Sequence, residues 1–215
     1  MHPIWLFDLD NTLHNASPHI FPHINRSMTA YLMRHLDLDE RDANRLRMDY
    51  WKRYGATLTG LMRHHGTRPE HFLHDTHQFP DLAQMVVFDR AVRHLLRRLP
   101  GKKIVFSNGP LRYAEAVLDV MGIRKLFADV YSVEQMRFHP KPKLAGFHHL
   151  IKDHQLNPRR CILVEDSAEN LRTAKRLGMK TVWISRSLRQ PDFVDCQLPS
   201  VLGLSRHRIR TLTSG

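Results

Sequence analysis

The stretch IWLFDLDNT, residues 4–12, determines how the rest of the chain is interpreted. Four apolar residues lead into Asp8 and Asp10, and a hydroxyl follows at Thr12. An apolar run of this kind is typical of a strand buried in a parallel sheet. Because ligands of open α/β sheets bind beyond the carboxyl ends of the strands, we expect both carboxylates at the mouth of such a crevice. The alternative is a strand end with two solvated acids and a turn at 11–12.

After residue 85 the sequence alternates between helical patterns and short apolar runs. The runs predict strands at 103–106, 129–132, 161–164 and 181–184. Together with the first strand they make five, and alternation of strands with helices favours a doubly wound, Rossmann-like α/β core with a mostly parallel sheet.

The segment between the first and second strands has a different pattern. Residues 17–85 contain helical periodicities and no convincing strand, which predicts a small all-helical domain inserted after the first strand. The expected domains are therefore a core of residues 1–16 and 86–190 and a helical cap of 17–85. Residues 191–215 are expected to form a C-terminal tail that is partly flexible.

Composition restricts the class of protein. The 215 residues contain 42% hydrophobic and 25% charged residues, as a globular domain does, and no apolar run reaches the length of a membrane span. The first strand begins so close to Met1 that no signal peptide fits, and Cys161 and Cys196 have no metal-ligand spacing. We therefore expect a cytoplasmic protein.

The net charge of +12 and the 16 histidines need separate explanations. Lys and Arg are scattered without interleaved aromatic residues, so a solvated basic surface is favoured, followed by steering of a phosphorylated substrate. The alternative explanation of the charge, which implies a different class of function, is nucleic-acid binding. His71, His74 and His77 recur every three residues and are interpreted as surface residues, with a structural metal site as the alternative.

Polar groups follow four of the predicted strands, and parallel strands bring such groups to one edge of the sheet. The residues are Asp8, Asp10, Ser107, Asn108, Lys141, Glu165 and Asp166. Clustered carboxylates repel unless a cation neutralises them, and oxygen ligands favour a hard ion such as Mg²⁺. The cation and Lys141 suit a dianionic phosphoryl group, to which Ser107 can donate a hydrogen bond. Asp8 is the candidate nucleophile, and Asp10 the candidate general acid and base.

These motifs resemble those of the haloacid dehalogenase-like (HAD) superfamily over about residues 3–186. The matching segments are 8–12, 106–108, 141–142 and 164–167 with Asn170. The resemblance implies a Rossmann-like core, Mg²⁺ and a phosphoaspartate mechanism. Haloacid dehalogenases proper lack an acid at the position of Asp10. Within this resemblance, Asp10 therefore favours phosphoryl transfer.

The resemblance implies roles for the individual residues. Asp8 would be nucleophile and metal ligand, and Asp10 would be the acid/base and bind metal through its backbone carbonyl. Asp166 would bind the metal directly, and Glu165 directly or through water. Lys141, rather than the neighbouring Lys143, and Ser107 with Asn108 would hold the phosphoryl group.

The helical insertion resembles the C1-type cap of this superfamily, and the segments 10–13, 50–55, 106–109 and 141–142 resemble the pyrimidine 5′-nucleotidase branch. That branch hydrolyses nucleoside monophosphates such as UMP and CMP. The open alternatives are a sugar-phosphate phosphatase such as phosphoglycolate phosphatase, a phosphomutase, and a non-catalytic nucleic-acid-binding protein. Aromatic residues within 50–54 either pack inside the cap or stack on a base. The expected partner is a small phosphorylated metabolite, and the oligomeric state is not indicated.

Overall fold

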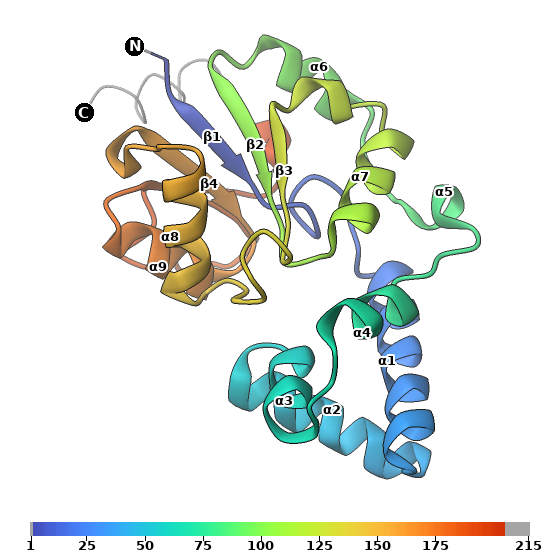
Figure 1. The fold of residues 1–215 in the computed structure, drawn as a ribbon. Coiled ribbons are helices and arrows are strands. Elements are labelled where there is room, and N and C mark those ends of the chain that lie inside the picture. Colours follow the sequence, from blue (N-terminus) through green and yellow to red (C-terminus); the bar gives the residue numbers. More distant parts are fainter. Residues whose placement is uncertain (1, 205–215) are drawn as a thin grey trace. The chain divides into compact units, whose positions relative to one another are not determined.

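The computed structural model describes residues 2–204 (Figure 1). The chain forms two compact units. One contains the chain up to Asn15 and from Val86 onward, and the other is the segment Ala16–Met85. We call them the core and the helical unit.

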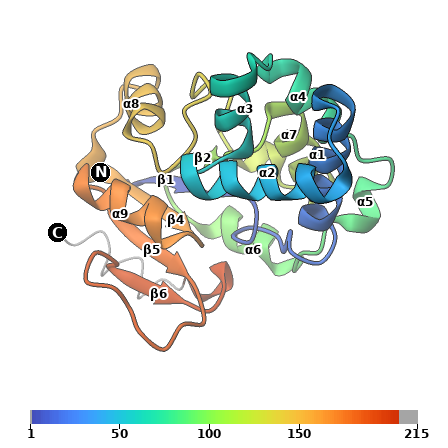
Figure 2. The same ribbon diagram turned by 90° about the horizontal axis from the view of Figure 1, so that it is seen from below.

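Within residues 2–204, the core contains a six-stranded sheet in the order β3-β2-β1-β4-β5-β6. All neighbouring strands are parallel. The strands are β1 Ile4–Phe7, β2 Lys102–Phe106, β3 Asp129–Tyr131, β4 Cys161–Glu165, β5 Lys180–Ile184 and β6 Cys196–Leu198. Figure 2 shows β4, β5 and β6 following one another away from β1. The predicted α/β fold is confirmed.

Helices connect the strands of the core. They are α6 Ala91–Arg98, α7 Leu111–Val120, α8 Leu144–Asp153 and α9 Ala168–Arg176, with short 3₁₀ turns η1 Arg124–Leu126, η2 Pro158–Arg160 and η3 Val201–Gly203. The chain progresses along the sheet in one direction from β1 to β3 and in the other from β3 to β5. Right-handed crossovers therefore place α6 and α7 on one face and α8 and α9 on the other.

The central strand β1 is fully enclosed. Trp5, Leu6 and Phe7 have no exposed surface, and the Trp5 indole donates a hydrogen bond to the carbonyl oxygen of Pro100 at 2.9 Å. Complete burial of one large apolar side chain stabilises a fold by about 1.5–3 kcal/mol. This run therefore both signals the strand in the sequence and fixes the position of Asp8 immediately after it.

The sixth strand corrects the prediction that residues 191–215 form a tail. Residues 196–198 pair with β5 in parallel, and Leu198, Val201 and Leu204 are buried. The pattern was missed because β6 has three residues, of which only Leu198 is buried. The remainder of the predicted tail, 205–215, lies outside the described residues.

The helical unit consists of α1 Ile20–Leu36, α2 Glu40–Tyr54, α3 Thr57–His65, α4 Pro69–Thr76 and α5 Leu82–Met85. The Asp39 side chain caps α2 by accepting a hydrogen bond from the amide of Asp42, and Gly55 ends the helix with a positive φ of 79°. Gly60 permits close packing of α3 on α2, since a Cβ there would lie 2.3 Å from Cγ of Tyr50. Across residues 2–204, no helix has the length and apolar character that crossing a membrane requires.

Candidate active site

The strand register brings the predicted site residues to one edge of the sheet. Phe7 of β1 is aligned with Val105 of β2 and with Val164 of β4. Asp8 directly follows β1, and Glu165 is the last residue of β4, so the two side chains lie at the same level at the end of the sheet. The carboxyl ends of these parallel strands thus collect the polar groups, as the sequence predicted.

Lys141 is the centre of the cluster. Its ammonium Nζ donates hydrogen bonds to Asp8 Oδ1 at 2.7 Å, to Glu165 Oε2 at 2.7 Å and to the carbonyl oxygen of Phe106 at 2.6 Å. The residue is only 2% exposed. A lysine buried to this extent needs such partners, because an isolated ammonium group loses its hydration on burial. Lys143, by contrast, lies at the N-terminus of α8 and is half-buried.

Asn108 holds the loop that carries Lys141. Its amide donates from Nδ2 to the carbonyl oxygen of Lys141 at 3.0 Å, and its Oδ1 accepts from the Lys141 amide at 2.8 Å. Both ends of the side chain therefore contact the backbone of Lys141. The Asn108 side chain thus positions Lys141, and the phosphate contact predicted for Asn108 stays a prediction.

Three carboxylates approach one another beside the lysine. One oxygen each of Asp8, Glu165 and Asp166 lies within 4.8 Å of the others. Burial and the Glu165 charge raise the pKa of Asp8 to about 7 although Lys141 opposes them, and burial and the Asp8 charge raise that of Asp166 to about 8. Burial lowers the pKa of Lys141, but Asp8 and Glu165 outweigh it and raise the pKa above its ordinary value.

The cluster contains three carboxyl groups and one ammonium group, and burial is the largest cause of the raised pKa values of Asp8 and Asp166. The donor set consists of oxygen atoms, and the group is compact enough to surround one small ion, so the residues fit a hard divalent cation such as Mg²⁺. Glu165 is already engaged at both oxygens, since Oε2 accepts from Lys141 and Oε1 from the Ser167 amide at 3.1 Å. Both oxygens of Asp8 accept hydrogen bonds as well, from Lys141 and Thr12, so these contacts do not rank Asp8 above Glu165 as a cation ligand.

Asp10 is held by two residues that the sequence analysis missed. Its Oδ1 accepts from the Tyr113 hydroxyl at 2.5 Å and lies 2.9 Å from Nε2 of His14. Within residues 2–204, the buried Nδ1 of His14 has no hydrogen-bond partner. A proton on Nδ1 would be a buried donor without an acceptor. The ring proton is therefore on Nε2, which donates a hydrogen bond to Asp10. Two donors thus converge on Oδ1.

The positions of His14 and Tyr113 in the sequence indicate their contacts with Asp10 only weakly. His14 lies four residues after Asp10, and Tyr113 lies in the first turn of α7 after the Ser107–Asn108 segment. Neither spacing specifies that the side chain turns toward Asp10. Burial and the Asp10 charge raise the pKa of Tyr113 well above its ordinary value, so the phenol stays protonated as a donor.

Two hydroxyl groups complete the cluster. Ser107 is 1% exposed, and its Oγ accepts from the amide of Gly109 at 3.0 Å. Thr12 donates from Oγ1 to Asp8 Oδ2 at 3.3 Å. Asp8 therefore receives a hydrogen bond on each oxygen, which fixes the orientation of its carboxylate.

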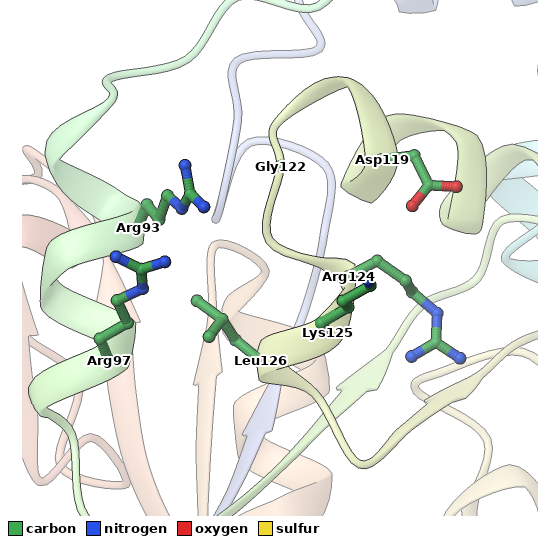
Figure 3. A pocket seen from close by; sticks show the side chains of 7 residues that line it. All are labelled: Arg93, Arg97, Asp119, Gly122, Arg124, Lys125 and Leu126. Carbon is green, nitrogen blue, oxygen red and sulfur yellow. The ribbon is translucent and has the colours of Figure 1, made fainter.

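A pocket of about 330 Å³ lies elsewhere on the core (Figure 3). Its lining residues are Arg93, Arg97, Asp119, Gly122, Arg124, Lys125 and Leu126. Arg93 and Arg97 extend from α6 toward Leu126, whereas Arg124 forms an ion pair with Glu115 at 3.1 Å. None of the candidate catalytic residues lines this pocket, so it is separate from the acidic cluster.

Comparison with known proteins identifies the family. The sequence profile of the haloacid dehalogenase-like hydrolases matches residues 4–178. The chain belongs to this family. The match spans all four segments that carry the acidic cluster, and it confirms the resemblance drawn from the sequence.

Individual relatives of this HAD-like hydrolase are distant. Phosphate metabolism protein 8 of Saccharomyces cerevisiae is 24% identical over 193 residues, which are 82% of this chain and 59% of the yeast protein. The chain thus spans about three fifths of that relative's length.

Solved structures share the fold. A HAD phosphatase from Thermococcus onnurineus superposes with a TM-score of 0.67 at 20% identity, covering 100% of this chain and 99% of that one. L-2-haloacid dehalogenase from Xanthobacter autotrophicus, with chloropropionic acid covalently bound, gives 0.59 at 19% identity, covering 94% and 96%. Since a phosphatase and a dehalogenase share this fold, the fold alone does not select the reaction.

Proposed function

We propose that this HAD-like hydrolase is a Mg²⁺-dependent phosphatase that hydrolyses small phosphomonoesters through an aspartyl-phosphate formed on Asp8. The observation that carries the proposal is the pair of acids with separate environments. Asp8 is oriented by Lys141 and Thr12, and Asp10 by Tyr113 and His14. One acid is thereby prepared for attack and the other for proton transfer.

The reaction divides between the two acids. A carboxylate oxygen of Asp8 attacks phosphorus and forms the acyl-phosphate bond as the ester P–O bond breaks, while Asp10 protonates the leaving alkoxide. Asp10 then takes a proton from water, whose oxygen attacks phosphorus and releases inorganic phosphate and free Asp8. Lys141 and Ser107 hydrogen-bond the phosphoryl oxygens during both steps. Asp8, Asp166 and the Asp10 carbonyl, with support from Glu165, would hold Mg²⁺, which would neutralise the charge of the phosphoryl group.

Asp10 favours phosphoryl transfer over dehalogenation. Halide is a stable anion that leaves without a proton, whereas an alkoxide leaves readily only when a general acid protonates it. An acid held by two buried donors therefore suits an oxygen leaving group. The name of the yeast relative, which refers to phosphate metabolism, is consistent with this proposal.

The proposed substrate is a nucleoside 5′-monophosphate. The support is the resemblance of segments 10–13, 50–55, 106–109 and 141–142 to the pyrimidine 5′-nucleotidase branch. Within the helical unit, Tyr50 hydrogen-bonds His65 and Tyr54 hydrogen-bonds His64, whereas Trp51 is 56% exposed.

The test is phosphate release from a panel of nucleotides and sugar phosphates with Mg²⁺, using Asp8→Asn as the control. We expect turnover of UMP or CMP that falls at least about a thousandfold in Asp8→Asn, because the nucleophile is lost. Turnover only of phosphoglycolate or another sugar phosphate would overturn the substrate assignment and keep the chemistry. Isomerised sugar phosphate without free phosphate would identify a phosphomutase.

The nucleic-acid-binding alternative has its own readout. The +12 net charge supports it. Salt-sensitive RNA or DNA binding that persists in Asp8→Asn, with no phosphate release from any panel member, would favour it over the phosphatase.

A further inference from the structure

A second group of potential metal ligands lies on the helical unit. His35 is in the last turn of α1, and His71 and Asp75 are on α4; we call these three residues the α1–α4 cluster. One ligand atom of each lies within 4.8 Å of the others. His71 belongs to the histidine repeat of residues 71–77, and the proposed phosphatase reaction does not use this segment.

The spacing within the α1–α4 cluster suits one transition-metal ion. The ring centroids of His35 and His71 are 5.3 Å apart. Two imidazoles bound tetrahedrally to one Zn²⁺ at about 2.0–2.1 Å place their centroids roughly 5 Å apart. His71 and Asp75 are separated by four residues on one helix, so both side chains extend from the same face. The two helices therefore already hold these side chains at the spacing that one ion requires.

A buried tyrosine orients the cluster. The Tyr31 hydroxyl is 2.9 Å from Nδ1 of His71, and Tyr31 is 4% exposed. Its ring packs on His35 with centroids 4.1 Å apart. Metal-bound histidines commonly use the second ring nitrogen for a hydrogen bond of this kind, which fixes the ring and leaves Nε2 as the ligand. Among the described residues, His35 has no hydrogen-bond partner that would compete for its nitrogens.

The carboxylate of Asp75 is weakly engaged. Arg34 Nη2 lies 3.4 Å from Oδ2, and His74 Nδ1 lies 3.5 Å from Oδ1. Both distances exceed those of strong charge-assisted hydrogen bonds, and the Arg34 and His74 side chains are more than half exposed. Asp75 can therefore turn to an ion at little cost.

We propose that His35, His71 and Asp75 bind one Zn²⁺ ion, with water as the fourth ligand. Imidazole ligands favour Zn²⁺ over Mg²⁺, which prefers oxygen donors. The ion joins the end of α1 to α4 across 40 residues of sequence, from His35 to Asp75, and stabilises the helical unit in proportion to its affinity for the folded state. This site is independent of the acidic cluster of the core and does not rest on the phosphatase proposal.

The test is Zn²⁺ binding to the full chain, purified without a histidine tag and stripped with chelator. Titration is performed in excess Mg²⁺ to occupy the acidic cluster, and repeated in Asp166→Asn to remove it. We expect one equivalent of Zn²⁺ to bind in both cases and to raise the melting temperature. Co²⁺ in place of Zn²⁺ should give the visible absorption of a tetrahedral N/O site.

Variants on one helix provide the controls. His71→Ala and Asp75→Asn should each weaken Zn²⁺ binding by at least about tenfold, and Tyr31→Phe should weaken it by a smaller factor through the lost hydrogen bond. His74→Ala, exposed on the same helix, should bind like the unmodified chain. Failure of the unmodified chain to bind one equivalent, or equal affinity in Asp75→Asn, His71→Ala and His74→Ala, would overturn the proposal.

Discussion

The two units of this chain offer metal ions two different environments. In the core, the carboxylates of Asp8 and Glu165 are buried around Lys141, and burial together with neighbouring carboxylates raises the pKa values of Asp8 and Asp166. In the helical unit, two imidazoles and one carboxylate lie at the surface of α1 and α4. The first arrangement suits a hard ion that takes part in chemistry, and the second suits a borderline ion that holds two helices together. Ligand type and burial, more than proximity, distinguish the sites.

Loss of Lys141 should have the largest effect on the core. Lys141→Met removes the only cation that contacts Asp8 and Glu165 among the described residues, leaving both carboxylates buried without it. We expect phosphatase activity to fall more than about a thousandfold and the free energy of unfolding to drop by about 3–5 kcal/mol. Urea unfolding and phosphate release measure the two effects. A variant as stable and active as the unmodified chain would show that the ion pairs are not formed in solution.

Mg²⁺ should stabilise the core and not the helical unit. At one hundred times its dissociation constant an ion adds about 2.7 kcal/mol to the free energy of unfolding. Thermal unfolding should therefore shift upward with Mg²⁺, and Asp166→Asn should abolish the shift while His71→Ala preserves it. An equal Mg²⁺ shift in Asp166→Asn would place the ion somewhere other than the acidic cluster.

The hydrogen bond from Tyr113 to Asp10 should contribute to turnover. Tyr113→Phe leaves Asp10 with one donor, and we expect kcat to fall by about 10–100-fold with KM little changed. Tyr131→Phe is the matched control, since the Tyr131 hydroxyl bonds Asp153 away from Asp10. Equal losses in both variants would indicate a packing effect.

These comparisons show which parts of the molecule the sequence could predict. The strand ends were predictable because a buried apolar run and the acid that follows it are adjacent in the chain, so burial of 5–7 fixes Asp8. The contacts that Tyr113 and His14 make with Asp10 could not be predicted from the sequence, because they depend on the directions of the side chains. The contact of Asn108 with the Lys141 backbone was not predictable either, because it joins segments 33 residues apart.

The sixth strand, β6, was missed in the sequence for a different reason. Only one of its three residues is buried, so no periodicity marks it. It is fixed instead by Asp195, whose Oδ2 accepts from the Thr181 amide at 2.8 Å and whose Oδ1 accepts from Lys175 at 2.6 Å. Polar anchoring of this kind leaves no hydrophobic pattern in the sequence.

Asp195→Asn should have the smallest effect. Burial raises the pKa of Asp195, but hydrogen bonds from Lys175 and Thr181 outweigh it and hold the pKa below its ordinary value. The resulting stability is complete above the unfolded pKa of about 4 and is lost as pH falls through the lower folded value. We expect a loss of about 1 kcal/mol at neutral pH that shrinks under acid conditions.

The control for that change is Glu169→Gln, which breaks an exposed ion pair with Arg172 within α9, the helix that also carries Lys175. Exposed pairs contribute little, so its free energy of unfolding should stay nearly constant. Urea unfolding of both variants at neutral and acid pH makes the comparison. A pH-independent loss in Asp195→Asn would contradict the anchoring role.

The most direct test of the central claim is chemical trapping of the phosphorylated residue. Turnover of a phosphate ester with Mg²⁺ is quenched in acid, the protein is reduced with borohydride, and peptides are mapped by mass spectrometry. Reduction of an aspartyl-phosphate yields homoserine, and we predict this conversion at Asp8 alone, and only when both Mg²⁺ and substrate are present. Conversion at Asp10, or phosphate release that is undiminished in Asp8→Asn, would contradict the assignment of Asp8 as nucleophile.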